Sequence, residues 1–388
     1  MSCNEWKEYK LEELCEYRKD KVKIDDINLY NYISTENMMP NKGGIEIASS
    51  LPNSKTVARY LEGDILISNI RPYFKKIWYA KNDGGNSNDV LVFKNISKDK
   101  LNNTFLYYLL SSDNFFDYVM STAKGTKMPR GDKDAIMRYN INLPSLEEQE
   151  KIANILSSLD DKIELNNEMN KTLEEMAQSI FKRWFVDFEF PNEDGEPYKS
   201  SDGEMVDSEL GMIPKGWEVG TLDNLGVFKN GKGINQDLRN DNGKNLIYGS
   251  NGIIGKTDEV LQKDNCIIIG RVGAYCGSIQ LSLEPCWVTD NAIMGTAKQR
   301  KYLPYLHRFL LNYPLRESAG GSAQPLINQS ILKSILTVMP PNELFDKYYD
   351  ISKEIIYKID DNNKENIMLS EIRDSLLPKL MSGEISVN

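Results

Sequence analysis

Two long stretches of the chain place apolar residues at alternating spacings of three and four, which predicts amphipathic helices. In residues 144–190 the apolar or seam positions are Ile152, Ile155, Leu159, Ile163, Asn166, Met169, Leu173, Met176, Ile180 and Trp184. Residues 340–388 repeat the pattern at Ile351, Ile355, Ile359, Asn362, Asn366, Leu369, Ile372, Leu376 and Leu380. Helices of about 40 residues would span roughly 60 Å, longer than a compact domain requires. We therefore expect them to pair as a coiled coil, with Ile163, Asn166, Leu173, Ile359, Asn362 and Leu369 on the seam.

Two of these seam residues, Asn166 and Asn362, are polar. A buried seam amide costs stability unless it finds a partner, and it fixes the register and orientation of the paired helices. The alternative is that both amides face solvent at a bend in the helix. Their places in the pattern favour a buried amide on the seam.

The helical stretches are copies of each other. "KIELNN" (Lys162 to Asn167) returns 196 positions later as "KIDDNN", and matches at this offset extend over at least forty residues. A second register, at an offset of 211, pairs "WKEYKLEEL" (Trp6 to Leu14) with "WEVGTLDNL" (Trp217 to Leu225). The chain thus contains two copies of a unit that consists of a variable domain followed by a helical tail. The expected segments are a first variable domain (1–143), a first tail (144–190), a linker rich in Gly, Ser and acidic residues (191–212), a second variable domain (213–339) and a second tail (340–388).

Each variable domain contains an apolar run that reads as a strand opening into a polar loop. These runs are "GDILISNIRP" (63–72) and "DNCIIIGRVGAYCG" (264–277), and each domain has a later Gly-broken loop, "AKGTKMPRGDK" (123–133) or "AGGSAQPLINQ" (319–329). Arg and Lys bond guanine edges or phosphates, while Asn and Gln read adenine. The candidate nucleic-acid contacts are Asn69, Arg71, Lys124, Lys127 and Arg130 in the first domain, and Arg271, Tyr275, Ser322 and Gln324 in the second. Ordinary solvated loops are the alternative for each of them.

Composition and charge refine this picture. The 388 residues are 40% hydrophobic and 27% charged, with a net charge of −10, which by itself argues against nucleic acid. The acid is concentrated in the tails and the linker, whereas the first variable domain has 21 basic and 19 acidic residues and the second has 14 and 10. Both domains can therefore neutralise phosphates locally. We find no apolar run of about 18 to 20 residues and no secretory signal, so we expect a cytoplasmic protein without a membrane helix.

The sequence contains few motifs that indicate catalysis, metal binding or cofactor binding. The single histidine, His307, lies in an apolar helical pattern, and the five cysteines lack the close pairs that bind zinc. "SNGIIGKT" (250–257) has Ser250 where a P-loop needs its first glycine, and "GRVGAYCG" (270–277) lacks the spacing of a dinucleotide loop. We find neither the tetrapeptide with which adenine methyltransferases hold a flipped base nor a convincing nuclease site. We therefore expect no catalytic residue, no metal site and no cofactor in this chain.

The chain resembles the specificity subunits of type I restriction-modification systems. The resemblance is carried by "LPSLEEQEKIANILSSLDDKIELNN" (143–167), "FVDFEFPNEDGEPYKSSDGEMVDSELGMIPKGWEVGTL" (185–222), "YGSNGIIG" (248–255) and "IRDSLLPKLMSGEI" (372–385). It implies a mixed α/β (α+β) fold in which two target recognition domains alternate with two long helices, packed as an antiparallel coiled coil with pseudo-twofold symmetry. The second tail departs from the family text, because it lacks the equivalent of Glu147, Glu148 and Gln149, so contacts with a second methyltransferase subunit could differ.

The resemblance also implies a function. Each recognition domain would read one half of a bipartite, asymmetric site in double-stranded DNA, and the helical pair would set the spacer between the halves. Two methyltransferase subunits and a nuclease-translocase restriction subunit would join the chain, and S-adenosylmethionine, ATP and Mg²⁺ would belong to those partners. Two alternatives compete with this non-catalytic role: the specificity portion of a single-chain restriction-methylation enzyme, and a coiled-coil scaffold with two protein-binding domains.

Overall fold

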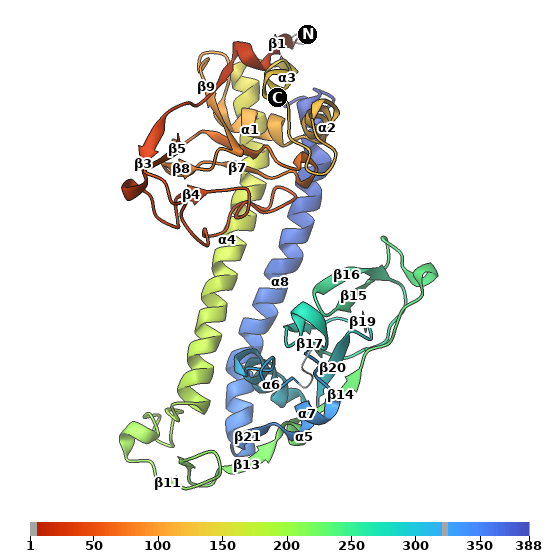
Figure 1. Ribbon diagram of the computed structural model, residues 1–388. Helices are drawn as coiled ribbons and strands as arrows, with labels where there is room; N and C mark the ends of the chain where they lie inside the picture. Colours follow the sequence, from red (N-terminus) through yellow and green to blue (C-terminus); the bar gives the residue numbers. More distant parts are fainter. Residues whose placement is uncertain (1–5, 320–324, 388) are drawn as a thin grey trace. The chain divides into compact units, whose positions relative to one another are not determined.

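The computed structural model describes residues 6–319 and 325–387. It divides into two compact units, of which unit 1 combines residues 1–165 with residues 365–388 and unit 2 comprises residues 166–364. Each unit holds one variable domain and parts of both long helices, α4 (Leu146–Phe185) and α8 (Asn342–Met381) (Figure 1). Among the described residues, no helix is both long and apolar enough to cross a membrane.

The variable domain of unit 1 is built on two four-stranded sheets, in the orders β2-β9-β6-β7 and β3-β5-β8-β4, while β1 pairs with β10. Its strands are β1 (Lys7–Lys10), β2 (Cys15–Tyr17), β3 (Lys21–Lys23), β4 (Tyr32–Ile33), β5 (Thr56–Tyr60), β6 (Ile65–Ser68), β7 (Ile77–Tyr79), β8 (Gly84–Asn86), β9 (Val90–Asn95) and β10 (Asn140–Leu143). Its short helices are α1 (Asn103–Ser111), α2 (Asp113–Thr122) and α3 (Lys133–Met137).

The variable domain of unit 2 repeats this plan. The sheet β14-β20-β17-β18 has the order of β2-β9-β6-β7, and the parallel pair of β15 with β19 matches that of β4 with β8. Its strands are β13 (Glu218–Thr221), β14 (Gly226–Asn230), β15 (Asn245–Gly249), β16 (Gly252–Thr257), β17 (Cys266–Gly270), β18 (Ile279–Ser282), β19 (Cys286–Val288), β20 (Ala292–Ala297) and β21 (Leu336–Met339). Its helices are α5 (Leu222–Leu225), α6 (Leu303–Asn312) and α7 (Gln329–Ser334). α2 has no helical counterpart in the described residues between α6 and α7.

The central strands explain the continuous apolar runs in the sequence. Side chains alternate between the two faces of a strand, and here both faces are covered. Ile65 and Ile67 of β6 pack into one core and Leu66 into another. In β17, Ile267 and Ile269 likewise face one core, while Cys266 and Ile268 face a second. Because both faces are buried, these strands lack the polar alternation of a surface strand.

The two long helices pack antiparallel in each unit. In unit 1, Ile152 and Leu156 near the start of α4 share a core with Leu377 and Leu380 near the end of α8. In unit 2, Phe185 at the end of α4 packs against Tyr348 near the start of α8, with ring centroids 4.8 Å apart. The antiparallel helical pair that the family resemblance implied is thus confirmed.

The predicted seam is only partly buried. Asn166 and Asn362 are 0% and 1% exposed, and Ile163, Leu173, Ile359 and Leu369 are half-buried. The spacing predicted the helices correctly, but five further stripe residues are exposed by 36% to 49%: Ile155, Met169, Met176, Ile351 and Ile372. One partner helix covers only a narrow stripe, and a straight helix drifts away from a strict heptad stripe by about 20° per heptad.

Amide side chains interlock on the seam within unit 2. Asn362 Nδ2 donates to Asn170 Oδ1 at 2.8 Å, and Asn170 Nδ2 donates to Asn363 Oδ1 at 2.9 Å. The buried Asn362 amide is therefore paired across the two helices, so the alternative that it faces solvent at a bend is wrong. A pair of this kind satisfies the amide at one register of the two helices.

Gln149, in the first turn of α4, is fully buried and joins this helix to the loops beside it. Its Nε2 donates to Lys100 O at 2.8 Å and to Pro144 O at 3.0 Å, and its Oε1 accepts from Asn102 N at 2.9 Å. At the matching position of the second copy stands Phe345, which is 1% exposed and packs in an apolar core. Gln149 of the first tail therefore has a structural role. In the second tail, Phe345 takes its place and packs against apolar residues instead of forming hydrogen bonds.

The segment 191–212, predicted to be a linker, makes defined contacts with its surroundings. The Phe190 ring, just before it, stacks on Tyr198 at 4.6 Å and on Trp217 at 5.1 Å between centroids. β11 (Met205–Val206) pairs with β12 (Ile213–Pro214). Apolar contacts thus fold this acidic segment against the start of the second variable domain.

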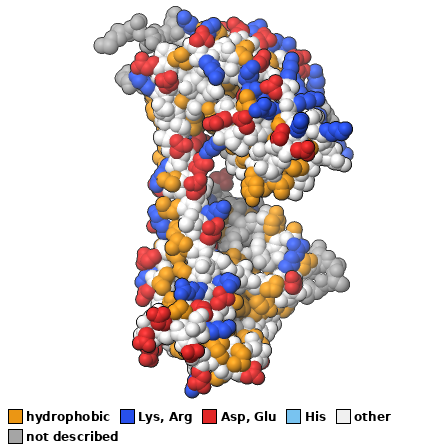
Figure 2. All heavy atoms as spheres, turned by 90° about the vertical axis from the view of Figure 1, so that its left-hand side faces the viewer, with side chains coloured by type: hydrophobic (Ala, Val, Ile, Leu, Met, Phe, Trp, Pro, Cys, Tyr) orange, Lys and Arg blue, Asp and Glu red, His pale blue; other side chains and the backbone are white. Residues whose placement is uncertain are grey.

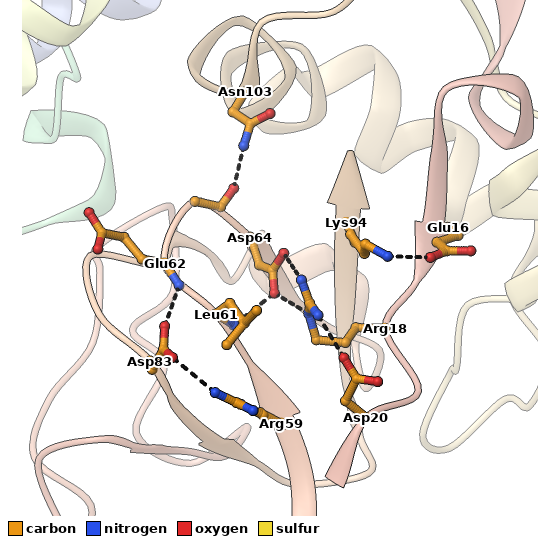
Figure 3. Close-up of polar contacts among 11 residues, drawn as sticks. Glu16, Arg18, Asp20, Arg59, Leu61, Glu62, Asp64, Asp83, Lys94 and Asn103 are labelled. Atoms are coloured by element: carbon orange, nitrogen blue, oxygen red, sulfur yellow. Dashed lines mark hydrogen bonds and ion pairs between the residues drawn. The ribbon is translucent and has the colours of Figure 1, made fainter. Parts of the chain in front are cut away.

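A buried ion pair ties β2 to the turn before β6 (Figure 3). Arg18 Nε and Nη2 bind Asp64 Oδ2 and Oδ1 at 2.5 and 3.0 Å, and both side chains are under 10% exposed. Leu61 N donates to the same carboxylate at 2.8 Å, and Arg18 Nη1 also binds the exposed Asp20. This carboxylate fixes the entry into β6, and therefore the strand that carries the candidate site.

Replacing Asp64 by Ala should lower the free energy of unfolding of unit 1 by about 3–5 kcal/mol, because the Arg18 charge remains buried without its main partner. Hydrogen exchange of the β6 and β9 amides in the full-length chain measures this loss. The matched control is Glu16→Ala, which breaks the solvent-exposed pair with Lys94 and should change exchange little. An equal effect of the two variants would contradict the role of the buried pair.

Replacing Asn170 by Ala should destabilise the helix pair of unit 2 by about 1–3 kcal/mol, because Asn362 Nδ2 stays buried and loses its acceptor. The double variant Asn170→Ala with Asn362→Leu should recover most of the loss, since neither partner is then left unpaired. Urea unfolding of the three chains measures both steps. A double variant no more stable than Asn170→Ala alone would show that this amide pair does not carry the effect.

Candidate nucleic-acid interface

Three loops of the first variable domain meet where β6 ends. Arg71 N donates to Pro129 O at 2.8 Å and Gly131 N donates to Asn69 O at 3.2 Å, while Asn69 N donates to Asp89 O at 2.8 Å. We call residues 69–75, 87–89 and 124–131 strand-end cluster 1. These backbone bonds bring together the predicted candidates of the first domain, Asn69, Arg71, Lys124, Lys127 and Arg130.

The five candidates differ in their environment. Arg71 and Lys127 are exposed and make no ion pair within the described part of the chain, whereas Asn69 is only 7% exposed. Lys124 binds Asp132 at 2.6 Å, which raises the pKa of its ammonium group, and Arg130 binds Asp89 at 3.2 Å. Arg71 and Lys127 are therefore the cations of this cluster that are readiest to bind an anion.

The turn after β6 is strained. Pro72–Phe74 form a 3₁₀ turn (η3) flanked by Arg71 (φ 49°, ψ 63°) and Lys75 (φ 49°, ψ 46°), both in the left-handed region. A side chain in that conformation costs about 1–2 kcal/mol, which glycine avoids. Strain of this kind persists where the surrounding structure enforces it, and such positions gather at functional sites. Arg71 and Lys75 thus occupy backbone positions at which glycine would be less strained.

The second variable domain forms a similar turn from other residues, which begins one position earlier in the matched register, so that Gly273 is the first residue of its turn whereas Arg71 precedes the turn of the first domain. Gly273–Tyr275 form a 3₁₀ turn (η6), with Gly273 (φ 74°) and Gly277 (φ 86°) at the positions of Arg71 and Lys75, 202 residues further along. Arg271 N donates to Asn291 O at 3.0 Å and Ile327 N donates to Arg271 O at 3.0 Å, as at Asn69. We call residues 271–277, 289–291 and 325–327 strand-end cluster 2. Arg271 therefore matches Asn69, and Gly273 matches Arg71.

Matched tyrosines stand at the tips of the two turns. Tyr73 of cluster 1 is 46% exposed and Tyr275 of cluster 2 is 50% exposed. Sequence reasoning found Tyr275 and missed Tyr73, which the 202-residue register of the two strands would have revealed. Of the other candidates in the second domain, Arg271 is half-buried with Nη1 3.5 Å from Asp290 O, and Ser322 and Gln324 lie outside the described residues.

Lysines also gather on another part of the first variable domain. Figure 2 shows many Lys and Arg side chains over the face of this domain that carries β3 and β5. Lys19, Lys21, Lys23 and Lys55 are exposed there. β3 is an edge strand, and lysines on an edge strand prevent pairing with another chain. Protection of this edge strand explains the lysines without a ligand, so we do not include them in the candidate interface.

The near P-loop is part of a β-hairpin. Gly252–Thr257 form β16, which pairs with β15, so no helix N-terminus follows the glycines as a phosphate loop requires. His307 is buried in α6, where burial and the nearby Arg308 lower its pKa to about 3. In the part of the chain that the structure describes, no three His, Cys, Asp or Glu side chains are grouped to hold a metal ion.

Comparison with known proteins accounts for the duplicated architecture. A family model, "Type I restriction modification DNA specificity domain", matches residues 4–175 and 214–369. The chain is 30% identical over 321 residues to the MjaIX specificity subunit, a type I restriction enzyme subunit of Methanocaldococcus jannaschii, covering 76% of this chain and 72% of that one. It is 27% identical over 464 residues to the HindI specificity subunit of Haemophilus influenzae, covering 98% and 100%.

A solved structure shares the fold. The S subunit of a type I restriction-modification system from M. genitalium matches with a TM-score of 0.65 and 18% identity, over 97% of this chain and 96% of that one. The family matches cover both variable domains and most of both tails. The chain therefore belongs to the type I restriction-modification DNA specificity family and carries the family's domain twice.

Proposed function

We propose that this chain is the DNA-reading subunit of a type I restriction-modification complex. Each variable domain reads one half of a bipartite, asymmetric site in double-stranded DNA through its strand-end cluster. The observation that carries the proposal is that two clusters share one backbone framework and present different side chains. A shared framework places both in the same way on the duplex, while Arg71 in one and Gly273 in the other make the two readings differ.

Side chains in the clusters suit the two kinds of contact that DNA offers. Arg71 and Lys127 are exposed cations for phosphates or guanine edges, and Tyr73 and Tyr275 present apolar ring faces beside a hydroxyl group. Strand ends and tight turns hold these groups on a rigid base. The other two candidate cations of cluster 1, Lys124 and Arg130, would have to exchange an acidic partner for a phosphate.

The chemistry of the complex would belong to other subunits. Two methyltransferase subunits would supply the S-adenosylmethionine-dependent adenine methylation, and a restriction subunit would use ATP and Mg²⁺ to translocate and cut DNA. The length of the paired helices, held in register by amides such as Asn170 and Asn362, would set the spacer between the half-sites. Such a complex would work where the DNA is, in the cytoplasm.

The proposal is tested with Arg71→Gly. Glycine suits the left-handed turn, so the variant should be at least as stable as the natural chain, while affinity for the specific duplex should fall about tenfold to a hundredfold. Fluorescence anisotropy of labelled duplex, titrated with the full-length chain and its methyltransferase subunit over a range of salt concentrations, measures the affinity. The matched control is Lys98→Ala, because Lys98 is exposed beyond the opposite end of β9.

Four outcomes separate the possibilities. If Arg71→Gly loses discrimination at a single base position, Arg71 contacts that base. If its affinity falls equally for all duplex sequences and depends less steeply on salt, Arg71 contacts a phosphate. Equal effects of Arg71→Gly and Lys98→Ala would place the interface elsewhere. A natural chain with no salt-dependent DNA affinity in the complex would instead support the coiled-coil scaffold.

A further inference from the structure

The hairpins that carry the two strand-end clusters have loops of equal length. Ile67 of β6 pairs with Ile77 of β7, and Ile269 of β17 pairs with Ile279 of β18, each 202 positions further along. Each pair encloses a loop of nine residues. Residues that lie 202 positions apart therefore occupy matching places in the two loops.

The two loops have one residue in common. The first reads "SNIRPYFKK" (68–76) and the second reads "GRVGAYCGS" (270–278), and only Tyr73 and Tyr275 are identical at matching places. At two of the other places, a cation of the first loop is a glycine in the second. The loops thus differ in charge and in shape around a tyrosine that both of them contain.

Packing within the chain does not explain this identity. Both tyrosine side chains are exposed, and neither belongs to an apolar core of the described residues. The hydroxyl groups of the buried Tyr60 and Tyr305 bond to Asn31 O at 3.1 Å and to Val338 O at 3.0 Å. Within the described part of the chain, the hydroxyl groups of the two loop tyrosines have no such partner. An aromatic ring with a hydroxyl group is thus present in both loops without a role in the fold.

Backbone hydrogen bonds hold both tyrosines in place. Asn41 N donates to Phe74 O at 2.7 Å, one residue after Tyr73, and Ser278 N donates to Tyr275 O at 3.1 Å. A tyrosine side chain has only two rotatable torsions before its hydroxyl group, so it loses little conformational entropy when it binds. The two loops therefore present a hydrogen-bond donor on a fixed backbone.

Two different half-sites of DNA have their sugar-phosphate backbone in common. The bases differ between the half-sites, so the side chains that read them must differ as well, as Arg71 and Gly273 do. The phosphates are the same in every duplex sequence, and tyrosine is among the residues that donate hydrogen bonds to them. A hydroxyl donor shared by two otherwise different loops therefore suits a phosphate better than a base.

We propose that Tyr73 and Tyr275 each donate a hydrogen bond from the hydroxyl group to a phosphate of the DNA backbone, one in each half-site. This inference rests on the proposed function and adds to it a contact that does not depend on the base sequence. The two tyrosines position both variable domains in the same way on the duplex, and the residues around them read the bases.

The test uses Tyr73→Phe and Tyr275→Phe, which remove only the hydroxyl group. Fluorescence anisotropy measures the affinity of the full-length chain with its methyltransferase subunit for the specific duplex. We expect a loss of about tenfold in each variant, because a hydrogen bond to a charged acceptor is removed. The dependence of affinity on salt should stay the same, since a neutral hydroxyl group releases no counterions. The sequence selected from a library with both half-sites randomised should also stay the same.

Methylphosphonate substitution locates the two phosphates. One phosphate at a time is replaced by the uncharged methylphosphonate along each half-site of the duplex. At one phosphate of one half-site, the replacement should weaken binding of the natural chain by about tenfold more than it weakens binding of Tyr73→Phe. Tyr275→Phe should show the same pattern at one phosphate of the other half-site. Replacements that weaken binding equally in the natural chain and in both variants at every phosphate would contradict the assigned contacts.

The matched control is Tyr30→Phe. Tyr30 is 73% exposed and precedes β4, near the start of β8, whereas cluster 1 includes the residues that follow the end of β8. This variant should keep the affinity of the natural chain. The urea midpoints of all three variants should equal that of the natural chain, because each change removes an exposed hydroxyl group.

Other outcomes overturn the inference. Unchanged affinity in Tyr73→Phe and Tyr275→Phe, with a loss in the corresponding alanine variants, would make the ring the contact in place of the hydroxyl group. Lost discrimination at a single base would make the hydroxyl group a base contact. A lower urea midpoint would give the tyrosines a role in the fold. A natural chain without salt-dependent DNA affinity in the complex would contradict the proposed function itself, which is distinguishable because it requires no variant.

Discussion

Backbone hydrogen bonds at the ends of β6 and β17 determine what the two variable domains present to a ligand. Asn69 and Arg271 each bond through the main chain to the loop before the next strand of the sheet and to a loop more than fifty residues further along the chain. The bonds hold three loops together without specifying any side chain. One framework can therefore carry different residues in its two copies, which is what reading two different half-sites requires.

The left-handed turns show this division most clearly. Arg71 and Gly273 both have positive φ angles, 49° and 74°, but only the glycine adopts such an angle without strain. The first copy keeps a cation at this position despite the strain, and the second copy leaves the position without a side chain. Similarly, Gln149 ties α4 to the first variable domain by hydrogen bonds, whereas Phe345 ties α8 to the second variable domain by apolar packing. The two halves thus share their architecture but differ in the side chains that stabilise it and in those that they present at the strand ends.

Much of this architecture could be predicted from the sequence, because the helices and the repeat are local patterns. The spacing of Ile152, Ile163 and Trp184 indicated α4, and "KIELNN" with "KIDDNN" revealed the duplication. The seam was predicted less well, since Ile155, Met176 and Ile372 share the spacing but are exposed. Only the position of the partner helix decides which side of a broad apolar stripe is covered.

The candidate site was harder to predict for a related reason. Apolar runs located both strand ends, but the match of Arg271 with Asn69, and of Tyr275 with Tyr73, depends on bonds between residues far apart in the sequence. The loops around Gly131 and Ile327 leave no local signal of this kind, because they lie more than fifty residues from the strand ends that they bond.

The most direct test of the account is a map of methylated adenines across the genome of the source strain, with and without the gene for this chain. If the two variable domains read the two halves of one site, deletion abolishes methylation at one motif made of two defined parts separated by a gap of fixed length, and the intact gene restores it. An unchanged map, or the loss of a single continuous motif, would contradict the claim that the two variable domains read the two halves of one DNA site.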